Sequence, residues 1–425
     1  MTQQKEISVT ERREGTEPNA SPGSACTNKS PPQPRSPQFA EVAIVFLRLG
    51  FTAFGGPAAH IAMMRDEVVR RRHWISDERF VDLLGITNLI PGPNSTELAI
   101  YLGYVRAGWP GLLVGGVCFI APAMLIVLVL AWAYVIYGSL PQVGWLFYGI
   151  KPVVVAIIAQ ALWGLCRTIL KGVWPIMLAL LVLGLYFFGV NVIVLLFGGG
   201  LLFGLLRGIE RWRKHKKNNA LASILIPFLF GSLRVRWQAL AAFSFGAAVA
   251  PVSLLILFLT FLKIGAVLYG SGYVLLAFLR TDLVQNLHWL TDKQLLDAIS
   301  VGQFTPGPVF TTATFIGYVV GGIPGALLAT LGIFLPSFVF VALIHPLAAR
   351  LRNSPWTASF LDGVNIAALA LMAGVLFQLG QNALIDVLTW AIALVSFVVL
   401  LRFKINSVWL ILASAIIGLA RFWLM

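Results

Sequence analysis

The sequence predicts an all-α polytopic membrane protein made of two homologous modules in inverted topology, each interrupted by a broken or re-entrant helix. Three observations predict this fold. The chain of 425 residues is 58% hydrophobic and only 11% charged, with a mean hydropathy of +0.86, which is too apolar for a soluble protein of this length. One half of the sequence matches the other half. Each half also carries a Pro-Gly-Pro tripeptide inside a stretch that is apolar and long enough to span a membrane.

The first segment, residues 1–39, is rich in proline, serine, threonine and mixed charge. Such a composition cannot bury a core, so the segment is predicted to be a disordered polar tail. Arg12 and Arg13 are not followed by an apolar stretch, so neither a secretory nor a twin-arginine signal is predicted. The first apolar span is therefore expected to remain in the mature protein.

An internal repeat accounts for most of the chain and predicts a first module at 40–207 and a second at 255–425. Gly50 aligns with Gly265 at an offset of 215 residues (265 minus 50), and the offset becomes 214 after one residue is dropped. The aligned pairs include Arg48 with Lys263, Arg65 with Arg280, His73 with His288, Asp77 with Asp292, Asp82 with Asp297, Gly92 with Gly307, Gly103 with Gly317, Pro122 with Pro336 and Gly149 with Gly363. A repeat of this length predicts two copies of one membrane module.

Basic residues indicate how the two modules face the membrane. The formal net charge of +14 lies in short loops beside apolar spans, which the positive-inside rule explains better than nucleic-acid binding does. In the first module the basic residues gather at 65–79, at 167–171 and from Arg207 onward. In the second module they occupy the loops that were bare in the first, at 350–352 and 402–404. The swap predicts inverted insertion, with the connector 208–254 containing a basic cytoplasmic linker at 208–236.

The first Pro-Gly-Pro lies in "LIPGPNSTELAIYLGY" and the second in "FTPGPVFTTATFIGY". A complete span at 85–105 would place either the arginines at 70–72 or the Arg167 loop outside, so a broken or re-entrant segment fits the charges better. Non-helical backbone at membrane depth is tolerated where it lines a cavity, which is the setting of a transport site. The breaks therefore predict a substrate site.

A helix that restarts inside the membrane presents unpaired N–H groups and a partial positive charge, which favour an anion. Hydroxyl groups follow each restart and would suit an oxyanion, although they could equally serve only as helix caps. The predicted substrate-binding residues at the breaks are Pro91, Gly92, Pro93, Asn94, Ser95 and Thr96 in the first module and Pro306, Gly307, Pro308, Thr311 and Thr312 in the second.

Two cations lie inside predicted spans at equivalent positions, Arg48 and Lys263. A buried cation is costly, so an intramembrane ionisable residue favours a functional interpretation, and two cations would match a dianion. The alternative is that both side chains extend to an interface or pair with Glu41 or another carboxylate.

Glu97 and Lys151 are the remaining span charges and the candidates for coupling. A carboxylate beside a cation cluster could neutralise an empty site or carry a proton. Lys151 could equally be an interfacial anchor, because it begins a long apolar run.

The sequence gives no indication of an enzyme. Cys26, Cys118 and Cys166 lie far apart without metal-ligand spacing, so neither a disulfide framework nor a metal site is expected. No Walker, GxSxG or HExxH pattern is present, and no cofactor is expected. A membrane enzyme acting on a lipid phosphate would need histidines or carboxylates at the breaks, where only His60 is near, and its counterpart is Leu275.

The ordered motifs "AFGGPAAHIAMM", "HWISDERFVDLLGITNLIPGPNSTELAIYLGY", "GWPG" and "FIAPAMLI" closely resemble the chromate ion transporter family in its long, two-module form. The resemblance covers nearly everything from residue 40 onward. It implies a secondary active transporter of the bacterial inner membrane that exports chromate and confers chromate resistance, driven by the membrane potential or the proton gradient. It also implies that essential residues concentrate in the first module, at Gly55, Gly56, Pro57 and the first Pro-Gly-Pro.

The second module departs from this pattern, since "YGSG" replaces "FGGP". Either both modules bind the ion, or one binds it and the other supports it. Sulfate is nearly isosteric with chromate, so a permease for sulfate or another oxyanion, or an anion channel, are the alternative functions. The expected partners are the oxyanion and membrane lipids, with a homodimer as a compatible assembly and no nucleic acid.

Overall fold

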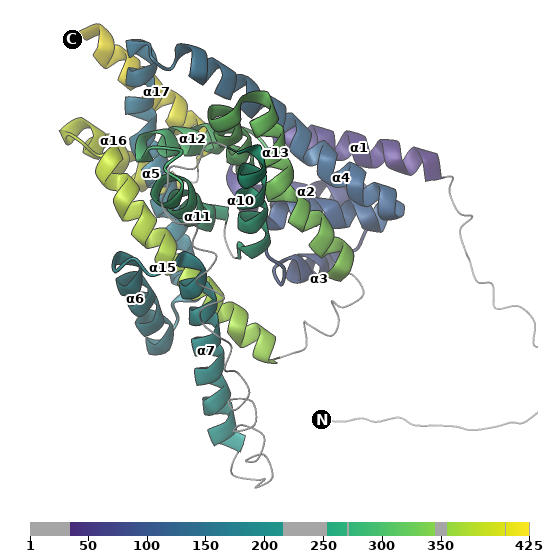
Figure 1. The fold of residues 1–425 in the computed structure, drawn as a ribbon. Coiled ribbons are helices and arrows are strands. Elements are labelled where there is room, and N and C mark those ends of the chain that lie inside the picture. The colour runs from purple at the N-terminus through teal and green to yellow at the C-terminus, as the bar shows by residue number, and fades with distance from the viewer. Residues whose placement is uncertain (1–34, 216–252, 270–271, 345–354, 404, 425) are drawn as a thin grey trace, which may run out of the picture. The chain divides into compact units, whose positions relative to one another are not determined.

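The computed structural model describes residues 35–215, 253–269, 272–344, 355–403 and 405–424 (Figure 1). Residues from Ser36 onward form one compact unit, and the description below concerns that unit. Most of the predicted tail and of the connector lie outside the described residues. The described ends of these two segments are helical: residues 35–39 belong to the first helix, and residues 208–215 extend the last helix of the first module.

The described residues form helices and no strands, in two matching sets. The first set consists of α1 (Arg35–Thr52), α2 (Gly56–Arg65), the π-helical turn η1 (Asp66–Arg71), α3 (Asp77–Thr87), α4 (Asn94–Tyr137), α5 (Pro141–Ile169), α6 (Val173–Phe187) and α7 (Val192–His215). The second consists of α10 (Leu254–Val267), η3 (Gly272–Val274), α11 (Leu275–Leu279), the π-helical turn η4 (Arg280–Asn286), α12 (Asp292–Phe304), η5 (Val309–Thr311), α13 (Thr312–Ile344), α15 (Pro355–Ala383), α16 (Val387–Phe403) and α17 (Ser407–Leu424).

Six stretches of the described helices are long and apolar enough to cross a membrane. They lie at Asn94–Tyr137, Pro141–Ile169, Val192–Ile209, Val309–Ile344, Trp356–Ala383 and Ser407–Leu424. The helices α6, α10 and α16 are shorter but also apolar. The prediction of an all-α polytopic membrane protein with two modules is confirmed.

Both predicted breaks are present. Helix α3 ends at Thr87 and α4 begins at Asn94, with Gly92 between them at a φ of 135°. In the second module α12 ends at Phe304 and the helix restarts at Val309, with Gly307 at a φ of 87°. Positive φ is accessible to glycine at little cost, whereas it strains other residues. The glycine of each Pro-Gly-Pro is therefore required by the backbone of the turn.

Each module contains a second interruption, which the motifs did not predict. Gly108 in α4 and Gly322 in α13 have φ values of 67° and 63°, so each long helix consists of two helices joined at a sharp kink. The two halves of α4 pack closely, because a Cβ added to Gly103 would lie 2.2 Å from the carbonyl oxygen of Gly111. Gly317 and Gly325 make the equivalent approach in α13. Small residues allow this packing, as expected in membrane helices.

The turn before each break is built alike in the two modules. Ser76 caps α3, and Thr291 caps α12 in a capping box with Gln294. The aspartate that follows each cap forms an ion pair with an arginine at the start of the preceding π-helical turn: Arg65, at the end of α2, pairs with Asp77, and Arg280, at the start of η4, pairs with Asp292. These aspartates are therefore structural.

Helices of each module pack against helices of the other module. In the first module, α5 packs against α16 and α17 of the second, and in return α15 packs against α6 and α7 (Figure 1). The breaks exchange hydrogen bonds in the same reciprocal way. The Gly92 N–H donates to the Leu268 carbonyl at 2.7 Å, and the Gly307 N–H donates to the Ala53 carbonyl at 2.8 Å. Ala53 and Leu268 are equivalent positions in the repeat, so the two hydrogen bonds are equivalent as well. This is the pattern expected of two modules related by a pseudo-twofold axis.

Candidate functional site

Backbone turns from both modules lie where the modules join. The turn Gly55-Gly56-Pro57 opens α2, with Gly55 and Gly56 at φ values of 99° and 78° and the proline in the first turn of the helix. It directly follows Ala53, whose carbonyl accepts from the second break. A Cβ added to Gly272 of the opposite module would lie 3.9 Å from the Pro57 ring. The turns that the family resemblance marked therefore lie against the second module.

The first break is lined by polar groups that are fully buried. A Cβ added to Gly92 would lie 2.2 Å from a carboxyl oxygen of Glu97 and 2.8 Å from the Ser337 hydroxyl of α13. Thr96, Glu97 and Ser337 are each 0% exposed. Their side-chain oxygens make no hydrogen bond of good geometry within the described protein. The nearest partner of the Glu97 carboxyl is the Ser337 hydroxyl, whose contact with it is not a well-formed hydrogen bond. Buried polar atoms are almost always well paired, so a cluster of poorly satisfied oxygens at one place is typical of a functional site.

His60 and Ser95 border this group. His60 is buried in α2, and its Nδ1 lies 3.4 Å from the Ser95 hydroxyl. On the other side, the Asn94 amide donates to the Asn88 side chain at 2.6 Å. The structure therefore brings together the predicted residues Gly92, Ser95, Thr96 and Glu97, and adds His60 and Ser337 to them.

The second break is less polar and better satisfied. Thr311 and Thr312 donate their hydroxyls to the carbonyls of Pro308 and Val309, both at 2.8 Å. A Cβ added to Gly307 would lie 2.7 Å from the Cβ of Ala123. Ala123 is the residue of the first module that is equivalent to Ser337, so an apolar group stands where the first break has a hydroxyl. These hydroxyls are satisfied within their own turn and do not cap the N–H groups of the helix, so the two breaks are alike in backbone but differ in chemistry.

The two predicted cations have different surroundings. The Lys263 ammonium lies 2.8 Å from both carboxylate oxygens of Asp282, which is the carboxylate partner that the sequence left open. Arg48 does not pair with Glu41, and its side chain is exposed on α1. Glu41 instead accepts from Arg72 at 3.0 Å and from Arg106 at 2.7 Å. The sequence could not identify these partners, which lie 19 to 65 residues apart.

Lys151 is buried at the junction of the modules and is not an interfacial anchor. Its ammonium lies 2.8 Å from Asp297 of α12, and the other oxygen of Asp297 accepts from the Tyr134 hydroxyl at 2.9 Å. Lys151 is 8% exposed and Asp297 is 2% exposed. The signal for Asp297 was its alignment with Asp82, because an acid at equivalent positions of both modules, beside apolar spans, is costly to bury without a partner.

Among the described residues, no group of three or more histidine, cysteine, aspartate or glutamate side chains is placed to hold a metal ion. Cys118 and Cys166 are free thiols, and Cys26 lies outside the described residues.

The chain has relatives among known proteins. The chromate transporter family profile matches residues 40–205 and 255–419, which are the two modules. The chain belongs to the chromate transporter family. It is similar to the chromate transport protein of Cupriavidus metallidurans, with 34% identity covering 90% of this chain and 93% of the relative. The chromate transport protein of Pseudomonas aeruginosa is 31% identical, covering 93% and 94%.

The probable chromate transport protein of Synechococcus elongatus is 32% identical, covering 83% of this chain and 87% of the relative. No solved structure matches the chain. Membership of the chromate transporter family and the apolar helices make this chain a multi-pass membrane transporter.

Proposed function

We propose that this protein is a secondary active transporter that exports chromate across the inner membrane of a bacterium and thereby confers chromate resistance. Support comes from the family and from the two relatives named chromate transport proteins that align over nine tenths of this chain. The structural observation behind the proposal is the meeting of both Pro-Gly-Pro breaks at the module junction, with poorly satisfied buried oxygens at the first. The basic linker at 208–236 would then face the cytoplasm.

The oxyanion would bind at the module junction, where the N-terminus of α4 offers backbone N–H groups and a partial positive charge. The residues proposed to line the site are Gly55, Gly56, Pro57, Pro91, Gly92, Pro93, Asn94, Ser95 and Thr96, with Pro306, Gly307, Pro308, Thr311 and Thr312 from the other module. Arg48 is proposed as a cation that attracts the dianion. Lys263, already neutralised by Asp282, would contribute only if that ion pair opens.

Glu97 is proposed as the group that carries the coupling proton, because its carboxyl is fully buried. No ion pair to Glu97 occurs within the described parts of the chain, and a buried carboxylate without a cation is far more costly than the neutral acid. Loss of the proton would place a negative charge beside a dianion, so protonation of Glu97 and occupancy by chromate would be linked. Lys151, held by Asp297, is the second coupling candidate.

The direction of transport is tested in everted membrane vesicles, in which export from the cell becomes uptake into the vesicle. Energised vesicles that contain the protein should accumulate chromate above vesicles that lack it, and sulfate should compete because it has the same charge and shape. Accumulation by whole cells instead of loss would contradict export and favour an uptake permease for sulfate. Flux down the gradient that does not respond to the membrane potential or the pH gradient would favour a channel.

The role of Glu97 is tested by Glu97→Gln, which mimics the neutral acid. The variant should still exchange chromate for chromate, but the flux should no longer change with pH. Ser337→Ala is a matched change beside the same carboxyl and should keep the pH dependence. Unchanged pH dependence in Glu97→Gln would contradict the proposed proton-carrying role.

A further inference from the structure

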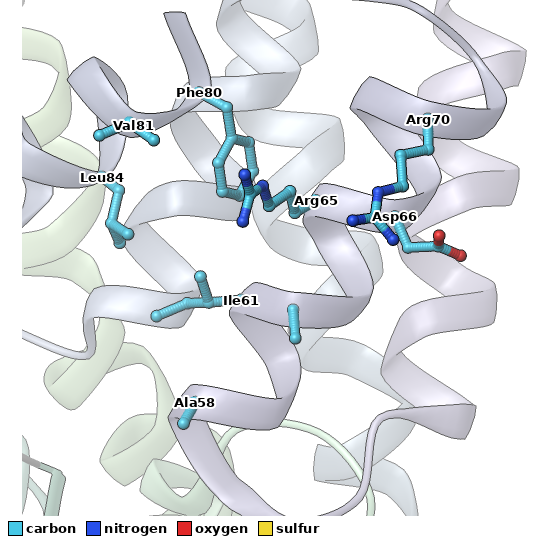
Figure 2. A pocket seen from close by; sticks show the side chains of 9 residues that line it. Ala58, Ile61, Arg65, Asp66, Arg70, Phe80, Val81 and Leu84 are labelled. Atoms are coloured by element: carbon cyan, nitrogen blue, oxygen red, sulfur yellow. The ribbon is translucent and has the colours of Figure 1, made fainter. Parts of the chain in front are cut away.

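A groove lies between α2 and α3, which both belong to the first module. It encloses a cavity of about 300 Å³. Ala58, Ile61 and Arg65 line one side from α2, and Phe80, Val81 and Leu84 line the other side from α3 (Figure 2). The walls are apolar along most of the groove. The charged side chains of Asp66 and Arg70 lie together at one end, whereas the Arg65 side chain points toward Phe80 (Figure 2).

Arg70 is the cation without an ion pair at that end: the pKa of Asp77 is lowered mainly by its hydrogen bond to Arg65, and Arg70 adds only a weaker, longer-range contribution. Three other arginines of the turn are neutralised, since Arg65 pairs with Asp77, Arg71 with Asp66, and Arg72 with Glu67. No ion pair to Arg70 occurs within the part of the chain that the structure describes. The groove therefore has an apolar length and one unmatched positive charge at its end.

The second module shows that this groove is not a necessary part of the fold. The residues equivalent to Ile61, Phe80, Val81 and Leu84 are all buried there: Leu276, Leu295, Leu296 and Ile299. Val81 is 54% exposed, whereas Leu296 is 1% exposed. The difference arises because α12 packs against α5, α15 and α17, and α11 packs against α15. Gln285 replaces Arg70, so the open groove and the unmatched cation occur together in the first module.

We propose that the groove between α2 and α3 binds one anionic phospholipid, with its phosphate beside Arg70 and an acyl chain along the apolar walls. The positive-inside rule predicts that the basic residues at 65–79 lie at the cytoplasmic membrane surface, where head groups and acyl chains of phospholipids are both available to the groove. Basic pockets between membrane helices recruit anionic head groups. The ligand needs both an apolar tail and a negative head, which excludes a free oxyanion. This inference does not depend on the substrate that the protein transports.

The test uses the full-length protein, purified in neutral detergent and depleted of lipid. Native mass spectrometry then counts bound lipid during titration with phosphatidylglycerol or phosphatidylcholine. Wild type should bind one phosphatidylglycerol at a concentration about fivefold lower than it needs for phosphatidylcholine, as one arginine near the phosphate would give. Arg70→Gln should remove this preference and leave phosphatidylcholine binding unchanged. Ala62→Trp, which fills the groove, should weaken binding of both lipids.

Two matched variants control for charge and bulk. Arg79→Gln removes an exposed arginine of α3 that does not line the groove, and Val117→Trp adds bulk on an exposed face of α4. Both should bind lipid as the wild type does. The proposal is overturned if wild type binds the two lipids equally, or if Arg79→Gln matches Arg70→Gln. It is also overturned if inorganic phosphate displaces the lipid at equal concentration, or if the groove is covered in a dimer that Ala62→Trp dissociates.

Discussion

At the first break, backbone conformation and close packing restrict which residue can occupy the glycine position. Gly92 has a positive φ, and Glu97 and Ser337 occupy the space that a side chain at this position would need. Its N–H also donates a hydrogen bond across the module junction. The motif predicted the glycine and the hydroxyls near it, because these requirements are local. Ser337 was not predicted, because its 240-residue separation from Glu97 (337 minus 97) leaves no local pattern. The partners of Lys151 and Lys263 were missed for the same reason.

Replacing Gly92 should abolish transport. In Gly92→Ala the new Cβ would lie 2.2 Å from Glu97, and the backbone would be strained by about 1–3 kcal/mol. Gly85→Ala is the matched control, because Gly85 lies in α3 with no neighbouring atom within 4 Å of an added Cβ. Chromate uptake into everted vesicles, normalised to the inserted protein, measures both. Wild-type uptake by Gly92→Ala would show that the break is not part of the site.

The two candidate cations should now differ in their importance. Arg48→Gln should reduce chromate uptake at least tenfold if Arg48 attracts the dianion, and Arg48→Lys should recover part of it because the charge is kept. Lys263→Gln leaves Asp282 unpaired, so it should lower the thermal stability of the purified protein as well as uptake. If both glutamine variants transport chromate at the wild-type rate, the hydroxyls and backbone amides bind the ion without them.

Local sequence decides where the helices begin and end. The caps at Ser76 and Thr291 and the breaks at both Pro-Gly-Pro motifs follow from side chains within a few residues, so they could be predicted. The kinks at Gly108 and Gly322 were missed because each lies inside a long, mainly apolar helix, where hydropathy favours one continuous span. The aligned Gly108 and Gly322, each two residues before a proline, were the available signal. Packing between α5 and α12 could not be predicted, because it joins helices from different modules.

The ion pair between α5 and α12 should be needed for stability. Lys151→Met would leave Asp297 charged and buried without its partner, which should cost about 3–5 kcal/mol. Adding Asp297→Asn to the same chain should restore much of the loss, because the isolated charge is removed. Lys171→Met, at an exposed position just after α5, is the control and should have little effect. Thermal unfolding of the purified protein measures the series, and a double variant no more stable than Lys151→Met would contradict this account.

At the scale of the whole molecule, the repeat and the packing of helices between its modules determine the architecture. The repeat could be predicted because aligned residues recur over each module. The packing of α5 and α15 against the other module could not, because both modules carry the same helices and the sequence does not show which copy packs where. The inverted orientation in the membrane stays a prediction based on the basic loops.

Inverted orientation should place the loops after α5 and after α15 on opposite sides of the membrane. Lys171→Cys and Ile385→Cys put a thiol at an exposed position in each loop, in a chain whose three native cysteines are replaced by serine. A membrane-impermeant maleimide should label Ile385→Cys in intact cells and Lys171→Cys only after the membrane is opened. Labelling of both positions from the same side would refute inversion.

The reciprocal hydrogen bonds at the breaks determine the smallest unit that can fold. Gly92 finds its acceptor at Leu268 and Gly307 finds its acceptor at Ala53, so neither module satisfies its own break. A module inserted alone would have an unpaired backbone N–H at its break, with no water in the bilayer to replace the missing hydrogen bond. The helix faces that normally pack against the other module would also be exposed to lipid. Two modules are therefore obligate complements. A chain cut within the connector and expressed as two genes should reassemble, whereas either gene alone should yield a protein that is degraded.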